Sequence, residues 1–442
     1  MLTGVQPLPN SPQAQVEPRM QTDVLVTAAI FVVVYGLIVV DRWDRTLIAM
    51  IGGLVAVLLG IVSQQRAFAA VDLNVIFLLV GMMVMAAVLA ETGFFDWLAI
   101  RSVRLSDGHP IRLLLILAVV TAVVSAFIDN VTTVVLMTPV TLSVARRLDL
   151  SAKPFLISSI FASNIGGTAT LIGDPPNILI GTAAGLGFDA FLVNLLPVII
   201  LVFIVFAGIM WLSFRHQLRV PDERRLLAVE RTEEKAIKDR PLMIRALAVT
   251  GLTIVGFLLH SVIHVEPATL ALLGAAVLML IGGLNVHRTL KEIEWSTIFF
   301  FVGLFILVEA LIDVGIIQGV AEELGKIANG NAGVATIGIL WISAGVSAIV
   351  DNIPYTATAI PVVKHLALSG IPAEPMWWAL SLGACLGGNL TIVGASANVV
   401  VANISERAGE PIKFSEFVKY GSVVVLASMV ICTGYLWVRY LI

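Results

Sequence analysis

The sequence contains one long duplication, and this duplication limits the folds that the chain can adopt. The stretch SAFIDNVTT at 125–133 returns as SAIVDNIPY at 347–355, 222 positions later. With one residue deleted, IGGTATLIGDPPN at 165–177 then matches LGGNLTIVGASAN at 386–398. Chance does not place so many glycine, asparagine and aspartate residues in register. We therefore expect two structural repeats built from the same elements.

Each repeat carries apolar runs that are long enough to cross a bilayer. Such a crossing takes about 20 apolar residues in a helix, and the first two runs lie at 24–40 and 47–62. The chain is 58% hydrophobic and only 13% charged, which is too apolar for a protein that faces water on all sides. We predict an all-α polytopic membrane protein.

We predict that each repeat consists of five spans, one of which is a broken helix, plus one re-entrant hairpin. The hairpin bends at the Asp-Asn pair, and the broken helix is interrupted by the Gly-rich stretch. A hairpin enters and leaves on one side, so each repeat crosses the membrane an odd number of times and the second repeat is inverted. In the first repeat we expect these segments at about 24–40, 46–63, 73–91, 111–148, 153–184 and 189–213.

Four regions follow from this division. Residues 1–22 are rich in Pro and Gln and have no basic stretch before an apolar core, so we expect a disordered tail and not a cleavable signal. The first inverted repeat is expected at 23–213 and the second at 246–442. Residues 214–245 carry charges of both signs and are interpreted as a cytoplasmic linker.

The distribution of basic residues predicts the orientation in a cell (inner) membrane. Lys and Arg gather on the cytoplasmic side of membrane proteins. If the N-terminus lies outside, on the periplasmic or extracellular side, all but five of the 27 Lys and Arg residues lie inside. The exceptions are Arg19, Arg66, Lys326, Lys364 and Arg439.

The two hairpin tips and the two breaks form the candidate site. Backbone that is not helical is tolerated in hydrocarbon only where protein or a water-filled cavity surrounds it. Inverted repeats with broken helices are the arrangement with which secondary transporters build a site near the membrane midplane. The predicted substrate- or ion-binding residues are Asp129, Asn130, Thr132, Thr133, Asn164, Gly167, Thr168, Thr170, Asp174, Asn177, Asp351, Asn352, Thr356, Asn389, Thr391, Ser396 and Asn398.

Four carboxylates are candidates for proton coupling, because an ionisable residue inside a membrane is a functional candidate by default. Asp129 and Asp351 stand at the two tips, where N-capping of the second helix is the alternative role. Asp174 has Ala395 as its counterpart, and a turn-stabilising role is its alternative. Glu309 lies well within a span, where it could instead hydrogen-bond between helices.

The distribution of charges and reactive groups restricts the function. No Lys or Arg falls inside a predicted span, which favours protons, sodium or a neutral solute over a multiply charged organic anion. Two cysteines are too few for a thiolate metal cage, so we expect no metal site and no cofactor other than a coupling ion. The chain has no His-Glu-x-x-His motif and no Ser and Lys dyad, so an enzyme is not predicted.

Four stretches carry a family resemblance, and they lie at 125–140, 163–180, 347–363 and 383–400. They resemble the arsenite permease and sodium/proton antiporter group of the ion transporter superfamily, which has a citrate-transporter-like domain, and above all its branch with the melanosomal P protein. The resemblance implies an elevator-type fold, usually dimeric. The first three spans of each repeat would form a scaffold, and the hairpins, broken helices and last spans a transport unit.

The resemblance also suggests that residues 94–105 and 316–327 form interfacial arms, which join the scaffold to the transport unit. It further suggests the transported solute. The leading hypothesis is proton-coupled efflux of arsenite or antimonite. The alternatives are a sodium/proton antiporter, a cation-coupled anion (carboxylate) symporter, and an anion channel. The sodium-coupled dicarboxylate relatives carry Ser-Asn-Thr at both tips, whereas this chain has Asp129 and Asp351 there, so their ligand sites do not transfer.

The partners expected from this hypothesis are a small inorganic solute, H+ or Na+ as coupling ion, and membrane lipid. The resemblance further implies a homodimer, and it allows an arsenite-stimulated ATPase subunit as a second partner. Nothing in the sequence indicates nucleic-acid binding.

Overall fold

The computed structural model describes residues 21–40, 42–218 and 236–442. These residues form helices joined by short turns, and no strand occurs among them. The predicted all-α fold with two inverted repeats is confirmed. Residues 1–20 of the predicted tail and 219–235 of the predicted linker lie outside the described residues. Residues 21–22 belong instead to the first helix, and 240–245 belong to the helix that begins the second repeat.

The first repeat has the expected order of spans, hairpin and broken helix. Its helices are α1 (Gln21–Val40), α2 (Arg45–Leu58), α3 (Gln64–Ala69), α4 (Leu73–Glu91), α5 (Phe94–Leu105), α6 (Pro110–Ser125), α7 (Asn130–Arg147), α8 (Lys153–Thr168), α9 (Pro175–Ala184) and α10 (Phe188–Phe214).

The second repeat follows the same order. Its helices are α12 (Arg240–Ile263), α13 (Pro267–Gly282), α14 (Val286–Lys291), α15 (Trp295–Asp313), α16 (Ile316–Ala328), α17 (Ala332–Ser347), α18 (Asn352–Leu368), α19 (Ala373–Gly387), the short turns η2 (Gly388–Leu390) and η3 (Ile392–Gly394), α20 (Ser396–Arg407), α21 (Phe414–Leu436) and η4 (Trp437–Leu441).

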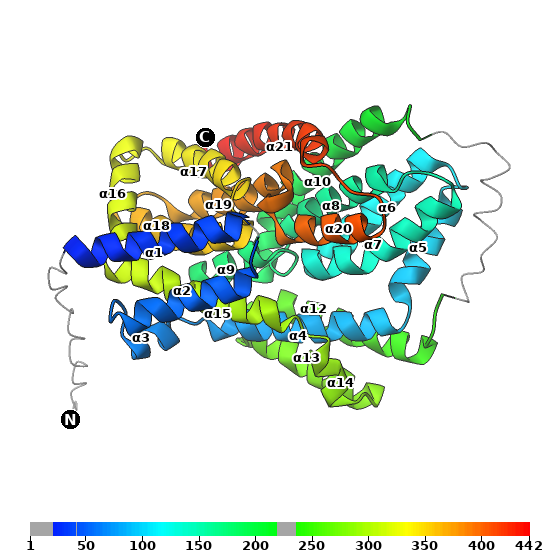
Figure 1. The fold of residues 1–442 in the computed structure, drawn as a ribbon, viewed down its shortest axis with the longest axis horizontal. Helices are drawn as coiled ribbons and strands as arrows, with labels where there is room; N and C mark the ends of the chain where they lie inside the picture. The colour runs from blue at the N-terminus through cyan, green and yellow to red at the C-terminus, as the bar shows by residue number, and fades with distance from the viewer. Residues whose placement is uncertain (1–20, 41, 219–235) are drawn as a thin grey trace, which may run out of the picture.

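The apolar helices fall into a longer and a shorter group. Among the described residues, six helices are long and apolar enough to cross a membrane, namely α1, α4, α10, α12, α15 and α21. The shorter apolar helices include the hairpin legs α6 and α17, as expected of legs that reach only part of the way, and also α2 and α13. The two hairpins enter from opposite ends of the molecule, α6 from the end with α5 and α17 from the end with α16 (Figure 1), so each repeat inverts the other.

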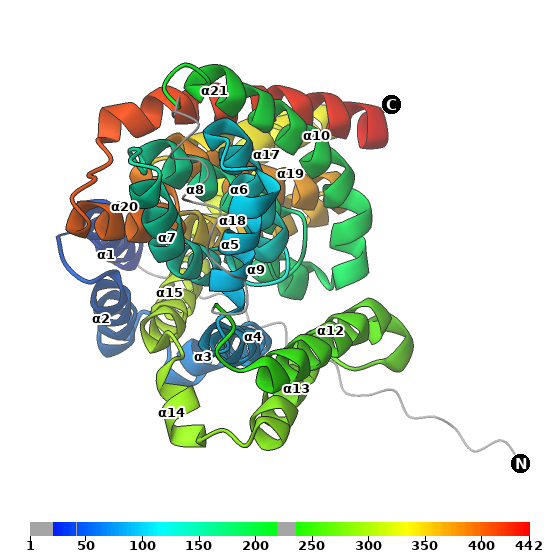
Figure 2. The ribbon, with the colours of Figure 1, turned by 90° about the vertical axis from the view of Figure 1, so that its right-hand side faces the viewer.

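The molecule has two layers, which are separated most clearly in the end view of Figure 2. One layer contains α2, α3, α4 and α12 to α15, and the other contains the hairpins, the broken helices, α10 and α21. In the first layer, α2 packs on α15 and α4 packs on α13, so the two repeats interlock. We call the first layer, together with α1, the scaffold, and the second layer the polar unit.

Small residues let the scaffold helices approach closely, as is usual between helices in membranes. A Cβ on Gly81 of α4 would lie 2.5 Å from the Ala271 backbone of α13, and a Cβ on Gly303 of α15 would lie 2.5 Å from the Ala49 backbone of α2. Gly81 and Gly303 are repeat equivalents. The duplication therefore fixes the same contact twice.

The helices α5 and α16 lie at opposite ends of the molecule and join the two layers (Figure 1). Each follows a glycine with positive φ, Gly93 at 82° and Gly315 at 80°, a conformation that glycine adopts without strain. The two glycines are repeat equivalents. The positions of α5 and α16 match those of the predicted interfacial arms.

Candidate functional site

The two hairpin tips are built in the same way. Asp129 caps α7 by accepting a hydrogen bond from the Thr132 amide at 2.9 Å, and Asp351 caps α18 by accepting one from the Ile353 amide at 3.0 Å. Both aspartates are only 5% exposed. N-capping is therefore one role of each, in addition to any role in transport.

Each tip is fastened to the break of its own repeat. The Thr170 hydroxyl donates to the Ala126 carbonyl at 2.5 Å, and the Thr391 hydroxyl donates to the Ala348 carbonyl at the same distance. These two bonds occupy equivalent positions in the repeats. Thr170 and Thr391, both predicted site residues, thus hold the hairpins against the broken helices.

Glycines make this close contact feasible. A Cβ on Gly166 would lie 2.1 Å from the Ala122 carbonyl oxygen, and one on Gly387 would lie 2.5 Å from the Ala344 Cα. Gly167 is held as closely, against the backbone of its own break. Gly167 therefore serves the site by allowing close packing.

In each broken helix, one asparagine side chain stabilises the non-helical turn. Asn177 Nδ2 donates to the carbonyls of Thr168 and Thr170 at 3.1 and 2.8 Å. Its equivalent, Asn398 Nδ2, donates to two carbonyls of the second break at 2.8 and 2.9 Å. Both asparagines are fully buried, so these bonds satisfy carbonyls that the interrupted helices leave without partners.

Amide side chains connect the two repeats at the centre of the polar unit. Asn130 Nδ2 donates to Asn164 Oδ1 at 3.1 Å, and Asn164 Nδ2 donates at 2.9 Å to both Asn389 Oδ1 and Asn398 Oδ1. Among the buried side-chain atoms of the described residues, Asn130 Oδ1 and Asn389 Nδ2 have no hydrogen-bond partner. A native protein rarely leaves such groups unpaired without a reason. They offer one acceptor and one donor to a small ligand.

Asp174 joins the second tip. Asn352 Nδ2 lies 3.2 and 3.3 Å from the two carboxylate oxygens of Asp174, which is fully buried. The contact connects the first break to the second hairpin, and no equivalent contact can form at Ala395. The predicted asymmetry of the site is therefore present in its geometry.

The sequence prediction of a site without cations is wrong. Arg45, the first residue of α2, reaches the second tip, where its Nη1 lies 3.1 Å from Asp351 Oδ2 and donates to the Ser396 hydroxyl. The Ser396 hydroxyl in turn donates to Asp351 Oδ2 at 2.5 Å. The Arg45 guanidinium also lies 5.6 Å from the Phe300 ring centroid. Arg45 was overlooked because it begins a span in the sequence and its partners follow about 300 positions later.

The other predicted threonines have structural bonds. The hydroxyls of Thr133, Thr168 and Thr356 donate to backbone carbonyls four or five residues earlier, at 3.2, 2.6 and 2.7 Å. Thr132 contributes its amide to the cap of its own tip. These residues shape the tips and the broken helix.

Glu309 does not join this cluster. It accepts a bond from Arg66 of α3 at 2.9 Å, and Arg66 also pairs with Asp313 at the end of α15. The pair of Arg66 with Asp313 has its repeat equivalent in Arg288 and Glu91, which lie 3.2 Å apart. The geometry thus favours the alternative considered for Glu309, a bond between scaffold helices.

A small cavity adjoins the tips, between the scaffold and the polar unit. Its lining includes Arg45, Asp129, Glu294, Phe300 and Ser396, and its volume is about 10 Å³. That is room for about one water molecule. In this conformation the polar site therefore fits an ion or a very small solute. Glu294, at the start of α15, was not predicted.

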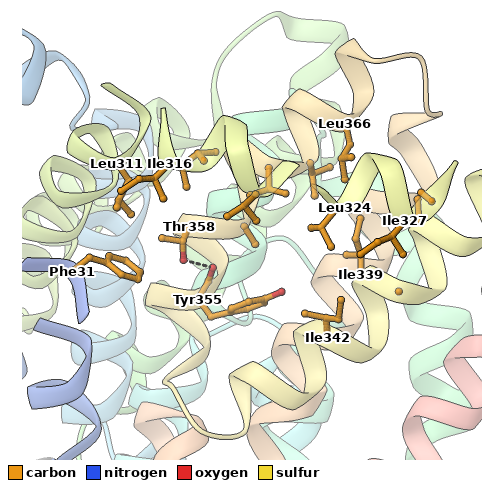
Figure 3. A pocket seen from close by; sticks show the side chains of 18 of the residues that line it. Phe31, Leu311, Ile316, Leu324, Ile327, Ile339, Ile342, Tyr355, Thr358 and Leu366 are labelled. Atoms are coloured by element: carbon orange, nitrogen blue, oxygen red, sulfur yellow. Dashed lines mark hydrogen bonds between the residues drawn. The ribbon is translucent and has the colours of Figure 1, made fainter. Parts of the chain in front are cut away.

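A second, much larger cavity has a different character. It measures about 530 Å³ and lies between α1, α16, α17 and α18. Phe31, Leu324 and Ile339 point into it, and Tyr355 and Thr358 are the polar residues drawn (Figure 3). Its apolar lining makes it unsuitable as an ion site.

Comparison with known families and proteins gives consistent matches along the chain. The family model described as "Citrate transporter" matches residues 35–383. An uncharacterized transporter of Mycobacterium tuberculosis is 42% identical over 425 residues, which cover 95% of this chain and 99% of that protein. The human P protein is 33% identical over 508 residues, which cover 96% of this chain and 61% of that protein.

Solved structures resemble the fold at low sequence identity. The YdaH transporter of Alcanivorax borkumensis has a TM-score of 0.60 and 14% identity, with coverage of 95% of this chain and 98% of that chain. MtrF of Neisseria gonorrhoeae, described among antimetabolite efflux pumps, has a TM-score of 0.59 and 13% identity, with coverage of 95% of both chains. At these identities the likeness concerns the fold alone.

Proposed function

This chain belongs to the citrate transporter family of the ion transporter superfamily and is a secondary transporter, and we propose that it moves a small inorganic solute in exchange for protons. The observation that carries the proposal is the convergence of three buried carboxylates, those of Asp129, Asp174 and Asp351. Asp174 contacts Asn352 beside Asp351, and Asp129 lines the same small cavity as the two partners of Asp351, Arg45 and Ser396. Carboxylates in such surroundings can bind and release protons as access alternates.

An elevator motion is the movement that we propose. The polar unit would slide along the scaffold, with the arms α5 and α16 as flexible connections. The contacts between the two layers support this. Many bonds within the polar unit recur in both repeats, whereas the bonds from the scaffold to the polar unit that the described residues show are those of Arg45 and Tyr35 at the second tip. A homodimer in the inner membrane would hold the scaffold still, as the family resemblance implies.

The present conformation is proposed to face the cytoplasm. The distribution of Lys and Arg supports an orientation in which the α5 end of the molecule (Figure 1) lies inside the cell. Arg45 and Glu294 lie at the starts of α2 and α15, which then face the cytoplasm. Because the second hairpin enters from the opposite face, its tip at Asp351 must lie deep towards the cytoplasm to reach Arg45.

Arsenite, or antimonite, is the solute that we propose. Arsenite is uncharged near neutral pH and could bind through its hydroxyls to the free groups of Asn130 and Asn389. Cys385 is buried and lies 3.6 Å from Asn177 Oδ1, and Cys432 is buried as well. Recognition through three thiolates is therefore not available, and the amide groups would carry it.

Sodium/proton antiport is the second candidate. The excess of carboxylates over the single guanidinium at the site favours it, since Asp129 and Glu294 line the same small cavity. A carboxylate such as citrate is favoured only by Arg45, whose charge Asp351 already balances. An anion channel is distinguished by a flux that does not saturate.

The experiment uses purified protein in liposomes that contain a pH-sensitive dye. Arsenite, antimonite, sodium, citrate and succinate are added one at a time under an imposed proton gradient. Proton movement on arsenite or antimonite is expected. Proton movement on sodium alone would show sodium/proton exchange in place of arsenite transport. Proton movement on citrate alone would contradict the inference that Asp351 already neutralises the charge of Arg45.

A further inference from the structure

The ion pair at the second tip joins two parts of the molecule that an elevator motion would have to separate. Arg45 belongs to the scaffold helix α2, whereas Asp351 and Ser396 begin helices of the polar unit, α18 and α20. Next to it, the Tyr35 hydroxyl of α1 donates to the Pro354 carbonyl of α18 at 2.8 Å. The polar unit is thus held to the scaffold by directed polar contacts at one tip.

In the opposite state of an elevator cycle, the two repeats would exchange their conformations. The repeat equivalents of the contacting residues then show which of these contacts could form again. The repeat equivalent of Arg45 is Pro267, and the equivalent of Ser396 is Pro175. Neither proline has a side-chain donor. In the exchanged conformation, the first tip would therefore meet a scaffold helix that offers Asp129 no cation.

The surroundings of the pair make it strong in the present conformation. The Asp351 side chain is 5% exposed and that of Arg45 is 29% exposed, so water screens the pair only in part. The Phe300 ring adds an attraction to the guanidinium. The charged or titratable groups that surround the pair are Tyr35, Asp129, Asp174 and Glu294.

We propose that Arg45, Asp351 and Ser396 form a one-sided latch, which holds the polar unit in the present conformation and opens when Asp351 loses its negative charge. The latch rests on the proposed elevator motion and adds a positioning residue to it. A proton or a cation on Asp351 would remove the attraction to Arg45. Release of the scaffold would then be coupled to loading of the second tip, and the return step would lack an equivalent hold.

The test measures the two conformations directly with cysteine cross-links in liposomes. Cys385 and Cys432 are first replaced by serine. The pair Tyr35→Cys with Pro354→Cys reports the present conformation when a bifunctional thiol reagent that spans the space of the tyrosine ring joins the two cysteines, since the Tyr35 hydroxyl contacts the Pro354 carbonyl. Their repeat equivalents, Phe257→Cys with Thr132→Cys, report the exchanged conformation. The yields of the two cross-links are compared for each latch variant.

Arg45→Gln and Asp351→Asn are each expected to raise the second yield relative to the first by about tenfold, as for the loss of a partly screened ion pair. The double variant is expected to match the single variants, and Arg45→Lys to lie between Arg45→Gln and the parent. Arg42→Gln, which changes an exposed arginine close to the start of α2, is the control expected to leave the ratio unchanged. Gel filtration identifies variants that do not fold.

Two results would overturn the latch, and they can be told apart. If the second cross-link forms in the parent protein and its yield is the same in Arg45→Gln, the latch is wrong and the elevator motion stands. If the second cross-link forms in none of the variants, the elevator motion is wrong and the latch falls with it.

Discussion

The tip at Asp129 and the tip at Asp351 share their backbone and differ in what surrounds them. Both aspartates cap the following helix, and both tips are fastened to a break by an equivalent threonine. Of these two aspartates, only Asp351 forms an ion pair with an arginine within the part of the chain that the structure describes. Duplication therefore reproduced the framework, while single substitutions such as Arg45 against Pro267 made the two chemical environments unequal.

The shared framework predicts equal effects at its glycines, and these are the largest that we expect. Gly166→Ala and Gly387→Ala each place a Cβ within 2.6 Å of backbone atoms of the adjacent hairpin leg. Each should lower the free energy of unfolding by about 3 kcal/mol, because neither side of the contact can yield. Reversible unfolding in mixed micelles measures this.

Gly208→Ala on α10 is the matched control for the glycine variants, since a Cβ there meets nothing within 4 Å. It should leave stability unchanged or raise it by up to about 1 kcal/mol. If Gly166→Ala were severe and Gly387→Ala harmless, the two repeats would not share one framework.

The unequal chemistry predicts different costs for the same substitution at the two tips. Asp351→Asn leaves the Arg45 guanidinium without its carboxylate and should cost about 2 kcal/mol, since the pair is partly buried. Asp129→Asn should cost less than about 0.5 kcal/mol, because asparagine caps a helix as well as aspartate does. The same unfolding measurement decides, and equal losses at both tips would remove the distinction.

The scaffold also contains two equivalent ion pairs in unequal surroundings, and the expected difference in stability is smaller. Arg66 pairs with Asp313, whose side chain is 1% exposed, whereas the equivalent Arg288 pairs with Glu91, whose side chain is 35% exposed. Arg66→Gln should therefore cost about 1 kcal/mol more than Arg288→Gln, which removes a pair near water. Thermal unfolding of the two variants compares them, and the reverse order would contradict the burial of Asp313.

The smallest change in stability is expected for an exposed ion pair that belongs to neither tip. Lys326 Nζ lies 2.6 Å from Glu323 Oε1 on α16, and both side chains are about 70% exposed. Lys326→Gln should change stability by less than about 0.5 kcal/mol. It gives the baseline for the other measurements, and a loss as large as that of Asp351→Asn would mean that the assay does not report on tip chemistry.

The framework could be predicted from the sequence because it depends on local signals that occur twice. Apolar length gave the spans, and Gly166 and Pro175 marked the first break. The partners of Arg45 could not be predicted, since a long side chain at a helix start can point into water or into a neighbouring layer. The bond from Asn164 to Asn389 likewise depends on the packing of the repeats against each other.

Proton coupling by the three buried carboxylates is the central claim, and proton flux into dye-loaded liposomes tests it most directly. With the solute identified by the panel, Asp129→Asn, Asp174→Asn and Asp351→Asn are measured beside Glu309→Gln. We predict near-complete loss of solute-driven proton movement in the three aspartate variants and its retention in Glu309→Gln. Full proton-driven transport in both Asp129→Asn and Asp351→Asn would contradict the account.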